Sequence, residues 1–167
     1  MKTLSRLLTA IMVLLTVSSC KNEDIIYDYA PYVLNINITD KEGNNLLDPN
    51  VDGNITDETI EMEYDGQTYT MVNTDDKYHG ESIPVSRYYL PHFYGLSLNS
   101  YRAPWHLSFG EFDRAVSAEY EMTLRIPTRN IEKHFKVTIS RKKDDRVADM
   151  WVDGVKHKPA DEYTIVL

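Results

Sequence analysis

Asp48, Asn50 and Asp52 are spaced like the first three oxygen ligands of a calcium-binding loop of the pattern D-x-N-x-D-G. Such a loop also needs a bidentate carboxylate at its twelfth position, which is occupied here by Thr59. The nearest carboxylate, on Glu58, falls one residue short of that position. Because Asp, Asn, Gly and Pro also form solvated turns without metal, we favour an ordinary loop. Calcium binding is the alternative, and a titration with calcium tests it.

A second group of residues suits binding rather than catalysis. Tyr88, Tyr89, Tyr94, Tyr101 and Trp105 fall within eighteen residues of the chain. Tyr and Trp combine an apolar face with a polar tip, which suits binding surfaces. On an exposed loop they would stack on sugar rings or anchor a protein partner. Since strands are rich in aromatic residues in any case, core packing is the alternative, and it is the one that we favour.

The remaining residue types give no catalytic constellation and predict no cofactor. The five His residues show none of the spacings typical of zinc ligands, and a single Cys excludes both a disulfide framework and a Cys-based zinc site. The chain has no G-x-S-x-G nucleophile motif and no glycine-rich phosphate loop. Glu111 and Asp113 are only two residues apart, which is a common accident in an acidic chain rather than the pair of a glycosidase. We therefore expect a protein that is not an enzyme.

The one Cys, Cys20, ends a segment with the layout of a secretory signal. Lys2 and Arg6 precede an apolar stretch of eleven residues, 7–17, which Thr9 and Thr16 alone interrupt. Small residues follow, as expected for a signal peptide. The stretch is too short to cross a bilayer as a stable helix. We expect cleavage that leaves Cys20 at the new N-terminus, with residues 1–19 as the signal peptide.

The end of this signal, Val17-Ser18-Ser19-Cys20, resembles the lipobox of bacterial lipoproteins. The resemblance implies that the Cys20 thiol receives a diacylglyceryl group and that the new N-terminus is acylated. Three acyl chains would anchor the protein stably, because each buried CH₂ contributes about 0.8 kcal/mol and one chain binds only reversibly. The membrane is therefore an expected partner.

Residues 20–30 are expected to form a lipidated acidic tether. Its first part, Lys21-Asn22-Glu23-Asp24, looks like the short surface-export signal of lipoproteins in Bacteroidetes-type gut anaerobes. This implies an outer-membrane lipoprotein that could be exposed at the cell surface. The whole chain has 18 Lys and Arg against 26 Asp and Glu, a formal charge of −8, which becomes −10 when cleavage removes Lys2 and Arg6. Such a balance argues against nucleic-acid binding.

The rest of the chain, residues 31–167, alternates between apolar and polar residues with the period of a strand. The clearest cases are 119–126 and 134–140, where every second residue is apolar. Asp65-Gly66 and Asp153-Gly154 each separate two such runs, and Asp-Gly is a strong signal of a two-residue hairpin turn. The other expected strands are 32–38, 60–64, 67–71, 85–90, 94–98, 105–109, 150–152, 155–157 and 163–167.

This pattern predicts an all-β domain, a single antiparallel β-sandwich of about eight or nine strands. Helix is expected at most as one or two turns within 111–118. The order of the turn motifs resembles that of small Bacteroidetes-type lipoproteins with an immunoglobulin-like sandwich, and this resemblance covers most of residues 20–155. It implies an immunoglobulin-like fold and carries no catalytic residues. Its motifs are Tyr29-Ala30-Pro31, Asp40-Lys41-Glu42-Gly43-Asn44, Leu46-Leu47-Asp48-Pro49, Tyr64-Asp65-Gly66 with Tyr69, Phe109-Gly110-Glu111 and Trp151-Val152-Asp153-Gly154.

Together these features predict a lipid-anchored envelope protein that acts as a non-enzymatic binding or accessory module for a protein or glycan ligand. Two alternatives stay open. One is a small lipid-anchored hydrolase acting on glycans or peptides, which would need a pocket with convergent titratable groups. The other is a structural subunit of an envelope assembly, which an exposed edge strand would favour.

The first prediction concerns the anchor. Replacing Cys20 with Ala should leave the protein without acyl chains and release it from the membrane fraction, since no other thiol can carry the lipid. Detergent phase partitioning measures this directly. Partitioning unchanged from that of the natural protein would contradict the lipoprotein interpretation.

Overall fold

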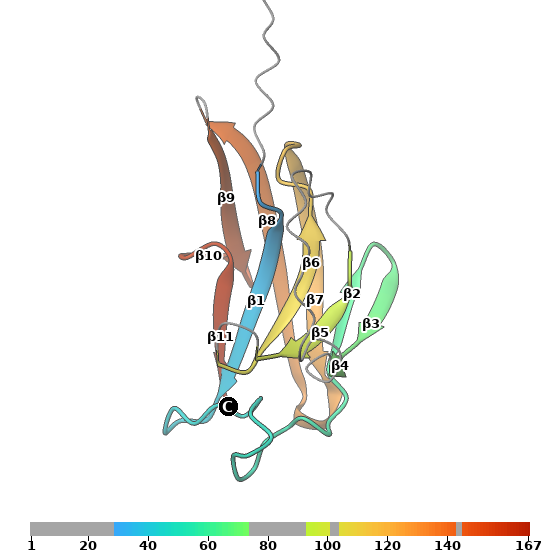
Figure 1. Ribbon diagram of the computed structural model, residues 1–167, viewed down its shortest axis with the longest axis vertical. Coiled ribbons are helices and arrows are strands. Elements are labelled where there is room, and N and C mark those ends of the chain that lie inside the picture. The colour runs from blue at the N-terminus through green and yellow to red at the C-terminus, as the bar shows by residue number, and fades with distance from the viewer. Residues whose placement is uncertain (1–28, 74–92, 101–103, 143–144) are drawn as a thin grey trace, which may run out of the picture.

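Alternating residues build two β-sheets packed face to face in the computed structural model of the protein (Figure 1). The structure describes residues 29–73, 93–100, 104–142 and 145–167. Over these residues the fold is an all-β sandwich, consistent with the immunoglobulin-like class, and contains no α-helix. Its one helical element is a short 3₁₀ turn, η1 (Pro127–Arg129).

One layer of the sandwich is a five-stranded sheet in the order β11-β1-β6-β5-β4. The neighbours β1 and β11 run parallel, as do β4 and β5, and the other two pairs are antiparallel. The strands are β1 (Tyr32–Thr39), β4 (Val72–Asn73), β5 (Leu96–Asn99), β6 (His106–Phe112) and β11 (Glu162–Val166).

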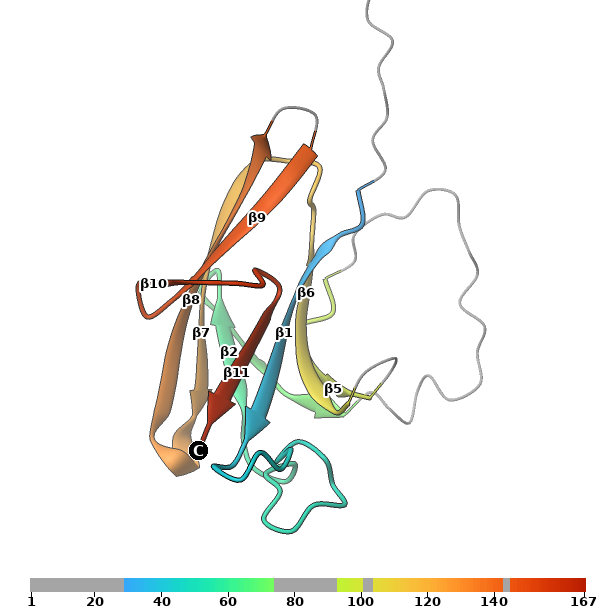
Figure 2. The same ribbon diagram turned by 90° about the vertical axis from the view of Figure 1, so that its left-hand side faces the viewer.

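The other layer is a six-stranded sheet in the order β10-β9-β8-β7-β2-β3, and every neighbouring pair is antiparallel. Figure 2 shows the two sheets from the side as separate layers. The strands are β2 (Glu61–Tyr64), β3 (Gln67–Thr70), β7 (Ala118–Ile126), β8 (Ile131–Lys142), β9 (Asp145–Val152) and β10 (Val155–His157).

The core fills the space between the sheets with one side chain from every second position. On β1 the buried residues are Tyr32, Leu34, Ile36 and Ile38, and they belong to the same core cluster as Leu124 and Val137 from the other sheet. Burying a side chain of this kind stabilises the fold by about 1.5–3 kcal/mol. The same alternation leaves the intervening residues of β7 and β8 on the outer face of the six-stranded sheet.

The two Asp-Gly turns have the predicted conformation. Asp65 and Gly66 have φ angles of 50° and 71°, and Asp153 and Gly154 have 51° and 80°. Positive φ at both central positions is what a type I′ hairpin turn requires, because its twist matches that of the strands it joins. The first turn joins β2 to β3 and the second joins β9 to β10.

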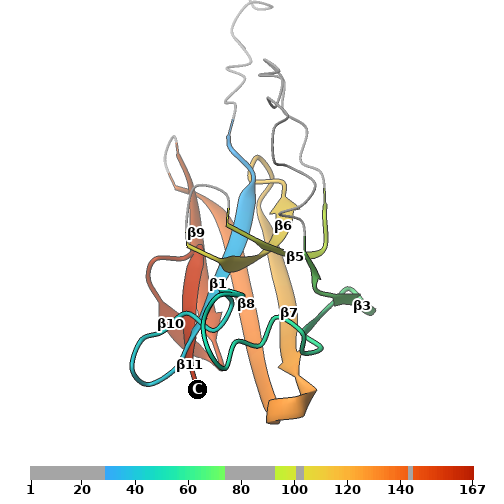
Figure 3. The ribbon, with the colours of Figure 1, turned by 60° about the horizontal axis from the view of Figure 1, so that its bottom comes forward.

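The long connection between β1 and β2 closes one end of the sandwich, as Figure 3 shows from below. Its apolar residues Leu46, Leu47, Ile55 and Ile60 are buried in the core. The segment is held to the sandwich by main-chain hydrogen bonds from Leu46 to Ile38 and from Ile55 to Leu46, both 2.9 Å long. The loop is therefore part of the core rather than an appendage.

The structure corrects the expected fold in three details. The described residues contain eleven strands rather than eight or nine, and two of the strand pairs are parallel. The stretch 111–118 is not helical: its first two residues end β6 and its last begins β7, because the ladders on both sides extend into it. The expected strand 85–90 lies outside the described residues.

The packing of Phe109 generates a stability prediction. This β6 side chain is fully buried, and its ring lies 5.1–5.9 Å from the rings of Tyr64, Tyr69, Phe93 and Phe112. We expect Phe109→Ala to lower the free energy of unfolding by about 3–5 kcal/mol through lost burial and a cavity. Urea denaturation measures the change.

The matched control is Val155→Ala, since Val155 is 61% exposed. It should change the free energy of unfolding by no more than about 0.5 kcal/mol. A loss at Phe109 as small as that of the control would show that the two sheets do not pack on each other as described.

Candidate functional site

The residues predicted to form a binding cluster are only partly within the described structure. Cys20, Tyr88, Tyr89 and Tyr101 lie outside the described residues. Tyr94 is 55% exposed, whereas Trp105 is half-buried and packs against the core. Trp105 is thus a core-packing residue, which is the alternative that the sequence favoured for this group.

The calcium-loop candidates lie in the segment that closes the end of the sandwich. Asp48 Oδ1 accepts hydrogen bonds from the main-chain N–H and the side-chain amide of Asn50, each 2.9 Å long. This is the Asx turn expected of an ordinary loop. Asp52 is exposed. Among the described residues no three His, Cys, Asp or Glu side chains are grouped so as to hold a metal ion. Calcium binding by this loop stays a hypothesis for titration.

A hollow of about 450 Å³ lies on the outer face of the six-stranded sheet. Its volume falls within the range of about 300–1,000 Å³ that is typical of small-ligand sites. Two hairpin turns, at Asp65-Gly66 and at Gly154, contribute to its lining. The residues that line it from the outer face of the strands are Glu63, Glu121, Thr123, His134, Lys136 and Trp151, and the neighbouring Tyr64, Met122 and Phe135 also contribute.

Strand register brings these side chains together from four strands. Glu63 on β2 lies opposite Thr123 on β7, which lies opposite His134 on β8. In the next row, Glu121 pairs with Lys136, which pairs with Trp151 on β9. Five of the six are flanked along their strands by residues that pack in or against the core, and His134 is followed by the buried Phe135. The alternation that builds the core therefore also builds this hollow.

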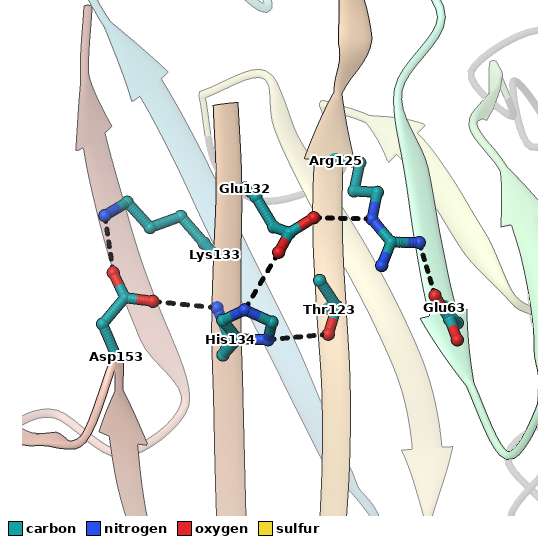
Figure 4. A network of polar contacts seen from close by, with 7 residues as sticks. All are labelled: Glu63, Thr123, Arg125, Glu132, Lys133, His134 and Asp153. Atoms are coloured by element: carbon teal, nitrogen blue, oxygen red, sulfur yellow. Dashed lines mark hydrogen bonds and ion pairs between the residues drawn. The ribbon is translucent and has the colours of Figure 1, made fainter. Parts of the chain in front are cut away.

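Ion pairs hold the carboxylates of this face in place (Figure 4). The Arg125 guanidinium bridges Glu63 on β2 and Glu132 on β8, and its Nε lies 2.8 Å from Glu132 Oε2. Hydrogen bonding to Arg125 lowers the pKa of Glu132. Both carboxylates accept hydrogen bonds from the Arg125 guanidinium, which holds them in position on the sheet.

His134 is held at both ring nitrogens. Its Nδ1 lies 3.0 Å from Thr123 Oγ1 and its Nε2 lies 3.1 Å from Glu132 Oε1, as Figure 4 shows. Its main-chain N–H donates to Asp153 Oδ1 at 3.0 Å. These contacts fix the orientation of the ring, although its side chain is 62% exposed.

Thr123 contacts His134, which contacts Glu132, and this chain of contacts has the order of a nucleophile, a base and an orienting carboxylate. Acyl transfer would also need free N–H donors for an oxyanion. Here β7 pairs with a strand on both sides around Thr123, and the main-chain N–H of His134 is bonded to Asp153. The arrangement therefore suits the positioning of a bound molecule better than attack on one.

Trp151 is the residue of this face that sequence reasoning missed as a binding residue. It lies between Met150 and Val152, which are both buried, so its indole projects from the opposite face of β9. The ammonium group of Lys156, its neighbour on β10, lies 5.1 Å from the ring centroid. The signal was present in the sequence, since an aromatic residue between two core positions of a strand must face outward.

Comparisons with known proteins do not add to this geometry. No protein-family model, no curated protein and no solved structure matches the chain. Within the described residues there is also no helix with the length and apolar character needed to traverse a bilayer.

Asp153 at the edge of this face generates a prediction about pH. Hydrogen bonds from Lys133, whose Nζ lies 2.6 Å away, and from the His134 main chain lower the pKa of Asp153 below its ordinary value of 3.8. The stability contributed by this charge is therefore present above the ordinary pKa and is lost as the pH falls through the lowered value of the folded protein. Because the side chain is 41% exposed, solvent limits that contribution to about 0.5–1 kcal/mol.

We therefore expect Asp153→Asn to lower the free energy of unfolding by about 0.5–1 kcal/mol at pH 7 and by progressively less toward acid pH. Asn tolerates the left-handed backbone of this position and keeps one acceptor oxygen for the His134 N–H, so the variant removes the charge and the bond to Lys133. Urea denaturation over a pH series measures the difference. Asp52→Asn, in chelator-containing buffer, is the control in an exposed loop. A deficit at Asp153 that does not change with pH would contradict the assignment.

Proposed function

We propose that the chain is a lipid-anchored, non-enzymatic binding module of the bacterial cell envelope. In this proposal acyl chains on Cys20 hold it in the outer membrane, and the sandwich binds a ligand on the outer face of its six-stranded sheet. The anchor rests on the signal layout of residues 1–19 and on the lipobox that ends in Cys20.

One observation carries the binding role: the hollow on the outer face combines an aromatic side chain with polar groups held in fixed positions. Trp151 supplies the apolar surface, and Glu63, Thr123 and His134 are held by contacts to neighbouring strands. Ligand sites need apolar contact area together with a few precisely placed polar groups. A rigid sheet provides both without a loss of conformational entropy on binding.

The spacing between anchor and domain is compatible with display. Eleven residues, 21–31, separate Cys20 from the start of β1 at Tyr32. A chain of that length spans at most about 40 Å when fully extended. This reach allows a sandwich tethered at Cys20 to stand off the lipid surface with its outer face accessible.

The test uses the full-length protein on liposomes and blocks one face at a time. Because the proposal puts a thioether on Cys20, the only Cys, an introduced Cys would be the only free thiol. Thr138→Cys places that thiol on β8, two residues from Lys136 and on the same face. Val166→Cys is the matched control, since Val166 is 62% exposed on β11 of the other sheet.

Each variant is coupled to a bulky polyethylene-glycol maleimide and assayed on a glycan array and by pull-down from the native envelope. We expect the label at position 138 to abolish retention and the label at position 166 to leave it intact. Equal retention by both labelled variants, or no retention by the unlabelled protein in either assay, would overturn the binding role. Reaction of the denatured natural protein with maleimide would overturn the anchor.

A further inference from the structure

We propose that the hollow on the outer face takes a neutral oligosaccharide, with one sugar ring stacked on the indole of Trp151. This inference rests on the proposed function and names its ligand class. It is carried by three features of the hollow: an aromatic wall, a mixed set of hydrogen-bonding groups and the balance of charge.

The aromatic wall is Trp151. The C–H face of a pyranose ring is apolar, and a flat indole matches it in shape and polarity. Lys156, on the edge strand β10, lies over this ring, and its ammonium group is paired with Asp149 at 2.8 Å. Lys156 thus contacts one face of the indole, and in this proposal the sugar stacks on the other face, beside the hollow that Trp151 lines. Few degrees of freedom are lost when a ligand stacks on a side chain held in this way.

The polar groups alternate between donors and acceptors across the floor. Glu121 accepts, Lys136 donates, and the Thr123 hydroxyl can do either. A sugar hydroxyl is likewise both a donor and an acceptor, so neighbouring hydroxyls can bond to neighbouring groups of opposite type. This floor matches a polyol better than it matches an apolar surface.

The charge balance selects against ionic ligands. Three carboxylates, on Glu63, Asp65 and Glu121, line the hollow against the single ammonium group of Lys136. A phosphate, a uronic acid or a nucleic acid would meet net repulsion there. A cationic peptide would compete with Arg125 for Glu63 and with Lys136 for Glu121. A neutral ligand avoids both costs.

The turns at the edge leave the hollow open. A Cβ atom built on Gly66 or Gly154 would meet no atom within 4 Å, so the space beside each of these glycines is open. A chain of sugars can therefore continue beyond the ring that stacks on Trp151. Recognition of an internal segment of a glycan, rather than of its end alone, follows from this openness.

The experiment titrates the full-length protein with neutral hexasaccharides of the gluco-, manno-, xylo- and galacto- series, by calorimetry and by indole fluorescence. An oligogalacturonate is the anionic probe and a chitosan oligomer is the cationic probe. We expect at least one neutral series to bind in preference to both charged probes. Trp151→Ala should weaken that binding about tenfold or more, because a Trp anchor dominates such sites, and Trp151→Phe should retain part of it.

Trp105→Phe is the matched control, since Trp105 packs against the core and does not line the hollow. It should leave the affinity unchanged, and thermal unfolding should show that every variant is folded. No binding of any neutral series, a preference for either charged probe, or binding that survives Trp151→Ala would overturn the inference.

This outcome is separable from failure of the proposed function. If the label at Thr138→Cys blocks retention of an envelope protein while no neutral oligosaccharide binds, the carbohydrate inference is wrong but the proposed binding face is supported. If that label has no effect on any retained ligand, the binding face itself falls.

Discussion

Alternation with a period of two along β7 and β8 is the constraint on which both the core and the outer face depend. Moving either strand by one residue would bring Glu121 or Lys136 into the core and expel Met122 or Phe135 from it. Several buried apolar side chains, each contributing about 1.5–3 kcal/mol, oppose such a slip. The register that brings Thr123 next to His134 is thus maintained by side chains on the opposite side of the sheet.

The hairpin turns extend this register to the strands at the edges of the hollow. Type I′ geometry at Asp153-Gly154 returns the chain so that Lys156 pairs with Trp151. The same turn places the Asp153 carboxylate within reach of the His134 main chain and of Lys133. The Asp153-Gly154 turn therefore connects the hairpin of β9 and β10 to the Lys133 side chain on β8.

The predictable parts of the structure are those that depend on local sequence. The strands of 119–126 and 134–140, both Asp-Gly turns and the all-β class follow from alternation and from turn chemistry, and the structure confirms them. The parallel pairing of β1 with β11 could not be predicted, because it joins the two ends of the domain and has no local signal. The burial of Ile55 could not be predicted either. Its neighbours in sequence are polar, and it is buried because its loop closes the end of the sandwich.

The candidate site shows the same division. The high density of aromatic residues in 88–105 suggested a binding cluster there, but Trp105 packs against the core. Trp151 stands alone in the sequence, and its neighbours in space, Lys136 and Lys156, come from strands on either side. Alternation along β9 predicts that the Trp151 side chain points outward. Which residues lie beside it depends on the order of the strands in the sheet, and the sequence alone does not reveal that order.

The polar network of the outer face contributes little to stability. Exposed ion pairs each contribute only about 0–1 kcal/mol, because solvent screens them and ordering long side chains costs entropy. The bridge from Arg125 to Glu63 and Glu132 is of this exposed kind. What such a network does provide is orientation: it fixes two carboxylates and, through Glu132, one imidazole before any ligand arrives. Preorganisation of this kind lowers the entropic cost of binding, and this supports the proposal that the face binds a ligand.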